Sequence, residues 1–250
     1  MAVSIKSARE IELMREAGKR LAHVHQELEA MIAPGISTWE IDAKGEKLIR
    51  DCGCIPNFLH YNGYPASICV SVNDEVVHGI PRKDRYLKEG DIVSLDAGLI
   101  YKGYHSDAAR THAVGKVSTE AQKLMDVTKQ SFFEGIKMAK EGQHLHDISR
   151  AIEEYVTPYG YGIVRDLVGH GIGTALHEDP QIPNYAQKRR GVRLQADMTL
   201  AIEPMINAGT WQVRFLRDGW TVVTKDGSLS AHYENTILVT DGEPEILTLY

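Results

Sequence analysis

Residues 34–53 read PGISTWEIDAKGEKLIRDCG, and residues 141–160 repeat the same plan as EGQHLHDISRAIEEYVTPYG. Each stretch has a glycine near its start, an isoleucine six residues later (Ile41 or Ile148) and a glycine at its end. Other features of the chain follow both stretches in the same order, which indicates an internal duplication. We therefore predict one domain over residues 1–250, built from related halves at approximately 1–116 and 117–250.

Each half is predicted to begin with two helices. SARE at Ser7–Glu10 and STWE at Ser37–Glu40 are capping boxes, in which a hydroxyl and a glutamate three residues later satisfy free backbone groups. TEAQ at 119–122 predicts a third capping box, and a fourth helix is expected within 141–160. Strand-like segments follow each helix pair, so the sequence predicts an α+β fold with helices packed on a sheet.

Composition excludes several classes of function. The chain is 43% hydrophobic with a net charge of −6, and without a clustered basic face we expect no specific nucleic-acid partner. Since no run approaches about 18 apolar residues and the N-terminus lacks an apolar signal region, we expect neither a membrane span nor export. Three sparse cysteines fit a reducing compartment, so we predict a cytoplasmic location.

The tripeptide His-Gly-Ile occurs twice, at His78–Ile80 and His170–Ile172, each time after an apolar run. Chance is one interpretation of this repeat. We favour a second, in which the triplets are a relic of the duplication and each half delivers a histidine to the same place.

Carboxylates on apolar strands are the most informative feature of the sequence. Asp96 follows IVSL and Glu203 follows MTLAI, and a second acidic strand in each half carries Asp107 or Glu234. For any one of them, a strand end that meets solvent is the simpler interpretation. Together they indicate more, because a buried ionised carboxylate costs several kcal/mol unless it is paired or holds a metal.

The YKGY segment between Asp96 and Asp107 predicts a hairpin that folds near Tyr101 and Lys102. Such a fold places the two carboxylates opposite each other, roughly 5 Å apart at Cβ. Four carboxylates and the imidazole of His170 would form a site suited to divalent Mn, Fe, Co or Zn. So many ligands favour two ions, about 3.5–4 Å apart, over one.

The segments HGIP, DAG…SDA, GHGIG…H, IEPM and SAHYENT resemble, in order and spacing, the methionine aminopeptidases of the bacterial type I class in peptidase family M24. The resemblance covers nearly the whole chain. It implies the pita-bread (creatinase/aminopeptidase) fold, with two pseudo-two-fold-related halves, helices on a curved antiparallel sheet and a single catalytic domain. It also implies a set of metal ligands: Asp96, Asp107, His170, Glu203 and Glu234. In that family pattern Asp107 and Glu234 would bridge two ions, Asp96 would complete one, and His170 with Glu203 the other.

The resemblance further implies removal of the N-terminal methionine from nascent proteins and peptides whose second residue is small. The two ions are expected to activate a bridging water for attack on the first peptide carbonyl. Glu203 would shuttle the proton, while His78 and His177 would contact the scissile amide and its carbonyl oxygen. These three residues are the predicted catalytic groups.

Six further residues resemble the lining of a methionine side-chain pocket: Phe58, Tyr61, Tyr64, Cys69, Leu176 and Trp220. An unbranched thioether suits an aromatic cleft of this kind, although without the family resemblance ordinary packing would explain these residues. His232 and Asn235 stand where many relatives carry Gln and His, and Leu176 where an aromatic residue is common. These departures concern metal preference and side-chain selectivity more than the reaction.

Two other functions remain open at this point. One is a proline-specific aminopeptidase or dipeptidase of the same fold, and the other is a non-catalytic binding module that has lost its ligands. All five ligand residues are present, which disfavours the binding module. The expected partners are the N-terminal peptides of nascent proteins, with transient ribosome contact by a monomeric enzyme.

Overall fold

A computed structural model describes residues 3–249. Its α-helices are α1 (Ala8–Glu29), α2 (Thr38–Asp51), α3 (Thr119–Ile136) and α4 (Leu145–Val156), with 3₁₀ turns η1 (Tyr61–Gly63) and η2 (Thr157–Tyr159). Two helices lie in each half of the chain, as the repeated sequence plan predicts. The mixture of helices and antiparallel strands confirms the predicted α+β class.

The helix starts agree with the sequence in two cases and differ in one. The capping boxes predicted at Ser7 and Ser37 are confirmed, because each serine N–H donates to the glutamate carboxylate three residues later, at 2.7 and 2.8 Å. The third prediction was wrong by one residue. Ser118 caps α3 and its hydroxyl accepts from the Ala121 N–H at 3.1 Å, so the N3 residue is an alanine that cannot complete a box.

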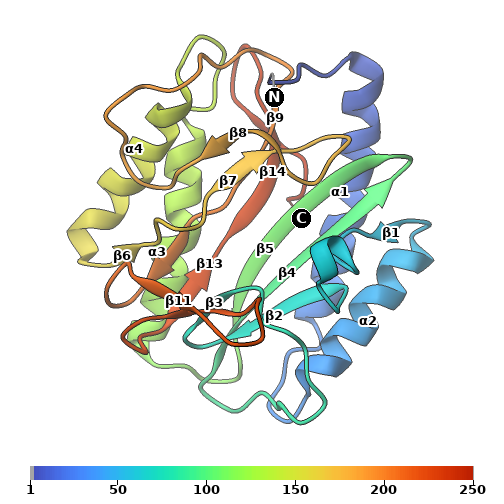
Figure 1. Ribbon diagram of the computed structural model, residues 1–250, viewed down its shortest axis with the longest axis vertical. Coiled ribbons are helices and arrows are strands. Elements are labelled where there is room, and N and C mark those ends of the chain that lie inside the picture. Colours follow the sequence, from blue (N-terminus) through green and yellow to red (C-terminus); the bar gives the residue numbers. More distant parts are fainter. Residues whose placement is uncertain (1–2, 250) are drawn as a thin grey trace.

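Nine of the strands in residues 3–249 form one antiparallel sheet, with the main order β1-β4-β5-β14-β9-β7-β8 and with β2 beside β4 and β15 beside β14 (Figure 1). Their bounds are β1 (Ile55–Pro56), β2 (Ile68–Val72), β4 (Ile92–Tyr101), β5 (Tyr104–Ala113), β7 (Gly169–Gly171), β8 (Glu178–Ile182), β9 (Thr199–Ile202), β14 (Glu234–Leu238) and β15 (Glu245–Ile246). Outward from the β5–β14 contact, β5, β4 and β2 of the first half mirror β14, β9 and β7 of the second. This order is the one expected for halves related by a pseudo-two-fold axis between β5 and β14.

Two three-stranded sheets complete the fold. One has the order β13-β10-β6 and the other the order β11-β12-β3, and Figure 1 shows β3 and β11 at the lower end of the view. Their strands are β3 (Glu75–Val77), β6 (Gly162–Ile163), β10 (Met205–Asn207), β11 (Val213–Phe215), β12 (Val222–Thr224) and β13 (Ser230–His232). These small sheets border the functional site described below, because β3 leads into His78 and β13 precedes Glu234.

The helices bury two apolar cores, one in each half of the molecule. The first joins α1 and α2 to β2, β4 and β5, with Leu21, Ile41 and Leu95 fully buried. The second joins α3 and α4 to strands of the second half, with Phe132 and Ile237 fully buried. Apolar residues at helical spacing therefore supply the packing against the sheet. Within residues 3–249, no helix combines the length and apolar character needed to cross a membrane.

The β4–β5 hairpin corrects the predicted position of two carboxylates. Its turn lies at Lys102 and Gly103, with φ of 48° and 88°, and it pairs Tyr101 with Tyr104. Two consecutive residues with positive φ make the tight hairpin connection that matches strand twist. Consequently Asp96 lies opposite Ala109 and Asp107 lies opposite Gly98, so the two aspartates are diagonal neighbours on one face.

The two His-Gly-Ile triplets occupy different places in the fold. His170 lies within β7 of the large sheet, whereas His78 follows β3 of a small sheet and adopts a left-handed φ of 59°. In the first half the strand equivalent to β7 is β2, which does not contain His78. The triplets are therefore not equivalent by the pseudo-two-fold axis, and the interpretation of the repeat as a relic of duplication was wrong.

Candidate metal centre and substrate pocket

Five side chains with metal-binding atoms line a single cavity of about 210 Å³. They come from four strands and one strand end: Asp96 on β4, Asp107 on β5, His170 on β7, Glu234 on β14, and Glu203 directly after β9. One donor atom each from Asp107, His170 and Glu234 lies within 4.8 Å of the others. The Nε2 atom of His170 is 3.5 Å from Glu203 Oε1 and 3.9 Å from Asp107 Oδ2. The structure thus brings together all five residues that the sequence suggested.

The carboxylates raise one another's pKa values in this buried cavity. Burial raises the pKa of Asp96 to about 7, against a lowering effect of its hydrogen bond with Asp107. Burial and the charge of Asp96 raise the pKa values of Asp107 and Glu203 well above their ordinary range. Glu234 is raised in the same direction by burial and by its acidic neighbours, first of all Asp107. Without a cation, this cluster binds protons that exposed carboxyl groups would release.

His170 is neutral at pH 7, with its ring orientation fixed by the backbone. Its Nδ1 lies 2.9 Å from the carbonyl oxygen of Gly171, and because a carbonyl can only accept, Nδ1 carries the ring proton. The Nε2 lone pair therefore faces Glu203 and Asp107. Burial lowers the pKa of His170 to about 3, with a further contribution from His177. A backbone carbonyl that fixes the tautomer in this way is typical of metal-binding histidines.

The donor set fits divalent cations. Among the described residues, Asp96 Oδ1, Asp107 Oδ1 and Glu234 Oε1 are buried without a hydrogen-bond partner. Buried polar atoms in this condition are costly, and a cation would satisfy all three. The separations of 3.5 and 3.9 Å from His170 Nε2 are too long for good hydrogen bonds. They suit ligands that each lie about 2 Å from a shared ion.

Two further histidines stand on the walls of the cavity. His177 is exposed, its ring centroid is 4.3 Å from that of His170, and its Nδ1 is 2.8 Å from the Tyr61 hydroxyl. His78 is half-buried and packs edge-on against Trp220, with centroids 6.3 Å apart. Burial lowers the pKa of His78 to about 4 and also lowers that of His177, so both are neutral at pH 7.

The six predicted pocket residues line the same cavity: Phe58, Tyr61, Tyr64, Cys69, Leu176 and Trp220. Tyr64 is buried, its hydroxyl donates to the Gly79 carbonyl at 2.9 Å, and its ring meets Trp220 edge-on at 5.2 Å. Cys69 faces Asp96 across the β2–β4 pairing. Burial, followed by the charge of Asp96, raises the pKa of the Cys69 thiol and keeps it uncharged. The result is an apolar pocket beside the acidic cluster.

Two residues outside the predicted ligand and pocket sets also reach the site. Asn62, which sequence reasoning did not assign to it, lines the main cavity. His232, which the sequence marked as a departure from the family pattern beside Glu234, lines an adjoining cavity of about 100 Å³ with His78 and Glu203, and its Nε2 lies 3.8 Å from Glu203 Oε2. It precedes Glu234 by two residues and so shares its face. Asn235 points to the other face, where it accepts from Arg110 Nη2 at 2.5 Å.

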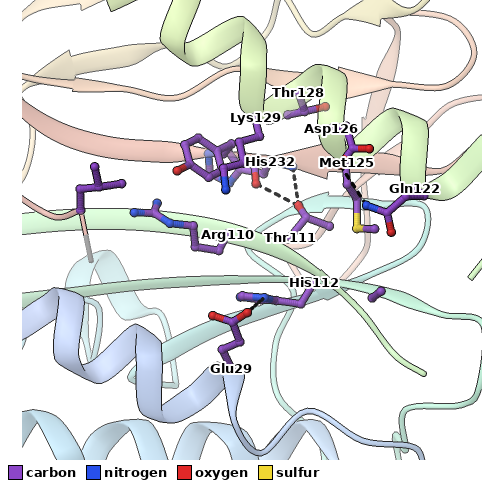
Figure 2. Close-up of a pocket in the computed structure, with 13 residues that line it drawn as sticks. Glu29, Arg110, Thr111, His112, Gln122, Met125, Asp126, Thr128, Lys129 and His232 are labelled. Atoms are coloured by element: carbon purple, nitrogen blue, oxygen red, sulfur yellow. Dashed lines mark hydrogen bonds and ion pairs between the residues drawn. The ribbon is translucent and has the colours of Figure 1, made fainter. Parts of the chain in front are cut away.

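A larger cavity of about 430 Å³ lies elsewhere, between the end of α1, β5 and α3 (Figure 2). Arg110 contributes to its wall, but its guanidinium already donates to the carbonyl oxygens of Ala109 and Thr248 and to Asn235. The described residues that line this larger cavity include none of Asp96, Asp107, His170, Glu203 and Glu234. Size alone would therefore have pointed to the wrong cavity.

Comparison with known proteins bears out the resemblance seen in the motifs. A methionine aminopeptidase from Clostridium acetobutylicum is 53% identical over 247 residues, which are 99% of both chains. The crystal structure of methionine aminopeptidase from Thermotoga maritima covers the whole of both chains, with a TM-score of 0.97 and 46% identity. A Xaa-Pro dipeptidase from Bacillus anthracis is more distant, with a TM-score of 0.79 and 26% identity, and this chain covers 61% of it.

The predicted pita-bread fold is shared with these structures and is confirmed. The model of Metallopeptidase family M24 matches residues 12–241, a range that contains all five residues of the acidic cluster and both wall histidines. On these grounds, the chain belongs to metallopeptidase family M24.

Proposed function

We propose that this chain is a metal-dependent aminopeptidase that removes the N-terminal methionine from nascent proteins and peptides, with preference for a small second residue. The observation that carries the proposal is the buried cluster of four carboxylates and His170 directly beside an apolar, aromatic pocket. The relatives named methionine aminopeptidase, at 46–53% identity over the whole chain, support the same reaction.

Two divalent ions per chain, of Mn, Fe, Co or Zn, are the proposed cofactors. Asp107 and Glu234, which lie on the two central strands that meet between the halves, would hold them together with Asp96, His170 and Glu203. Bound ions would supply the positive charge that lowers the pKa of a water and stabilises a developing oxyanion. The unpartnered oxygens of Asp96, Asp107 and Glu234 support this assignment.

Glu203 is the proposed proton shuttle. Its carboxyl group lines the cavity that would hold the substrate, so it can take a proton from the attacking water and deliver it to a leaving amine. Its Oε1 lies 3.5 Å from His170 Nε2 and its Oε2 lies 3.8 Å from His232 Nε2. Each carboxylate oxygen therefore lies near a neutral imidazole ring. A carboxyl group in this setting can act as base and then as acid in one turnover.

His78 and His177 are the proposed contacts to the scissile peptide. When the Tyr61 hydroxyl donates to Nδ1 of His177, the ring proton is on Nε2 and can be given to the substrate carbonyl oxygen. His78 would contact the amide nitrogen from the opposite wall. The methionine side chain would occupy the pocket formed by Phe58, Tyr61, Tyr64, Cys69, Leu176 and Trp220. Since both histidines stand close to the scissile bond, a small second residue would fit best.

The wider properties follow from the same proposal. Residues 1–250 would work as a single catalytic domain, because two of the proposed ligands come from its first half and three from its second. The three free cysteines fit a reducing compartment, so we place the enzyme in the cytoplasm. There it would act as a monomer on nascent chains, with transient contact to the ribosome.

A proline-specific peptidase is the alternative to test. The relevant experiment compares cleavage of Met-Ala-Ser, Met-Lys-Ser and Ala-Pro-Phe, before and after metal removal with EDTA. We expect rapid cleavage of Met-Ala-Ser only, loss of cleavage after chelation and recovery on addition of Co(II) or Mn(II). Asp107→Asn should reduce kcat/KM at least about 100-fold. The exposed Asp126→Asn on α3 is the matched control and should stay within twofold. Preference for Ala-Pro-Phe, or full activity after chelation, would refute the proposal.

A further inference from the structure

The two halves of the large sheet meet along β5 and β14, and direct pairing there is short. The register pairs are Ala109 with Glu234 and Ala108 with Asn235. If the ladder continued in register, Asp107 would face Thr236 at one end and Thr111 would face His232 at the other. At both positions a threonine hydroxyl takes the place of the direct backbone bonds.

Thr236 holds both backbone groups of Asp107. Its Oγ1 accepts from the Asp107 N–H at 3.0 Å and donates to the Asp107 carbonyl oxygen at 2.9 Å. Thr236 is fully buried and Asp107 is 4% exposed, so water cannot readily substitute for the hydroxyl. The carboxylate oxygen Oδ1 of the same aspartate is left without a hydrogen-bond partner among the described residues. The backbone is thereby fixed while the carboxylate remains available.

Thr111 repeats this arrangement at the other end of the seam. Its Oγ1 accepts from the His232 N–H at 2.8 Å and donates to the His232 carbonyl oxygen at 2.9 Å, as the dashed lines in Figure 2 show. The two threonines lie on opposite strands of the seam, Thr111 on β5 and Thr236 on β14. Because a hydroxyl is inserted where strands would bond directly, each arrangement widens the seam beside a residue of the site.

The strand that carries Thr236 is itself firmly held. The Thr236 N–H donates to Thr248 Oγ1 at 3.2 Å, and Thr248 donates to Asn235 Oδ1 at 2.9 Å. Arg110 donates to the Glu234 carbonyl and to Asn235 from the face opposite to the acidic cluster. Loss of the Thr236 hydroxyl should therefore release Asp107 while β14 keeps its place.

We propose that Thr236 is a positioning residue for the metal centre, which holds the Asp107 backbone so that its carboxylate points between Glu234 and His170. This inference rests on the proposed function, because it assumes that Asp107 binds a cation. A merely structural threonine would stabilise the fold without any specific effect on metal affinity or metal geometry.

The test uses full-length protein with Thr236→Val, which removes the hydroxyl, and Thr236→Ser, which keeps it but removes the methyl group. Thr224→Val is the control, since Thr224 is equally buried and donates to the Ser228 carbonyl at 2.8 Å on β12, away from Asp107. Three properties are measured: Co(II) affinity of the metal-free protein by calorimetry, the visible spectrum of bound Co(II), and kcat and KM for Met-Ala-Ser.

We expect Thr236→Val to weaken Co(II) binding by about tenfold or more, the usual size for lost support of a ligand, and to change the Co(II) spectrum. Its kcat should fall while KM stays within about twofold. Thr236→Ser should bind Co(II) within about threefold of wild type, and Thr224→Val within about twofold. If Thr236→Val does not fold, Thr236→Ala takes its place, because it also lacks the hydroxyl; wild-type Co(II) affinity and spectrum in that variant would likewise overturn the inference.

Two results would overturn the inference while leaving the proposed function intact. One is wild-type Co(II) affinity and spectrum in Thr236→Val, and the other is an equal loss of affinity in Thr224→Val. A tenfold loss in Thr236→Ser would also overturn it. A wild-type protein that binds no Co(II) and leaves Met-Ala-Ser intact would instead refute the proposed function, and this inference with it.

Discussion

The acidic cluster should make the stability of the metal-free protein fall as pH rises above neutrality. Asp96 has a pKa of about 7 in the folded protein because of burial, against about 3.9 for an unfolded aspartate. A carboxyl group whose pKa is raised by folding binds more protons in the folded state. Its contribution to stability is therefore lost as pH rises from the unfolded pKa through the folded pKa.

The histidines act in the opposite direction at lower pH and define the useful window. Burial lowers the pKa values of seven of them: His25, His78, His105, His112, His170, His177 and His232. Their unfolded forms gain protons as pH falls through about 6.5, so acid destabilises the fold through them. Above about pH 7.5 the histidines are almost entirely neutral in both states, and the carboxylates dominate the pH dependence.

The size of the effect can be worked out for the window from pH 7.5 to 9.5. Asp96 loses its remaining proton there and contributes about 0.2 kcal/mol. At about 1.36 kcal/mol per proton and pH unit, a carboxyl group that keeps its proton across these two pH units in the folded state contributes up to about 2.7 kcal/mol. Asp107, Glu203 and Glu234 are raised well above their ordinary values and add to it in the same direction. For a chain of this length, about 1 kcal/mol corresponds to roughly 2–4 °C in Tm.

Thermal denaturation after exhaustive chelation measures this effect. We expect the Tm of the metal-free protein to fall by at least about 2 °C between pH 7.5 and 9.5. Protein loaded with Co(II) should change less, because a bound ion already keeps the carboxylates ionised. Asp96→Asn should reduce the fall and raise the metal-free Tm at pH 8.5. A metal-free Tm that is constant or rises over this window, in wild type and variant alike, would refute the reasoning.

Three substitutions test the site itself. Glu203→Gln should lower kcat for Met-Ala-Ser by about 100-fold or more, because it removes the proposed proton shuttle; a fall below tenfold would assign that role elsewhere. Leu176 is 2% exposed, so Leu176→Ala should lower the free energy of unfolding in denaturant titrations by about 2–5 kcal/mol and also reduce kcat/KM. An unchanged KM would place Leu176 outside the pocket. His177→Ala should lower kcat/KM while Tm stays within about 2 °C, because this side chain is exposed; a large loss of Tm would indicate a structural role.

Local patterns in the sequence predict much of this fold. The capping boxes at Ser7 and Ser37 set the helix starts, and the order of helices and acidic strands predicts the two halves. The acidic residues were found because a charge within an apolar strand is costly without a partner. These features depend on a few neighbouring residues, so a single sequence carries them.

The register of paired strands and the structural equivalence of repeated motifs were harder to predict, because both depend on contacts between distant segments. The hairpin prediction was wrong because the turn uses Lys102 and Gly103, both with positive φ. The cross-strand partner of Asp107 is therefore Gly98 and not Asp96. Identical letters at the two His-Gly-Ile triplets gave no information on strand order. The contact between Thr236 and Asp107, which are 129 residues apart, has no local pattern at all.

The position of the acidic cluster follows from the order of the strands in the large sheet. Each half contributes one carboxylate from its central strand and one from the next position outward, and joining β5 to β14 brings all four together. Neither half alone would bury so many like charges. The unfavourable free energy of burying them is offset by the two apolar cores, which lie away from the seam. The proposed cation would remove this cost at the place where the fold is electrostatically least favourable. Metal binding should therefore stabilise the whole chain, because the seam is also the junction between its halves.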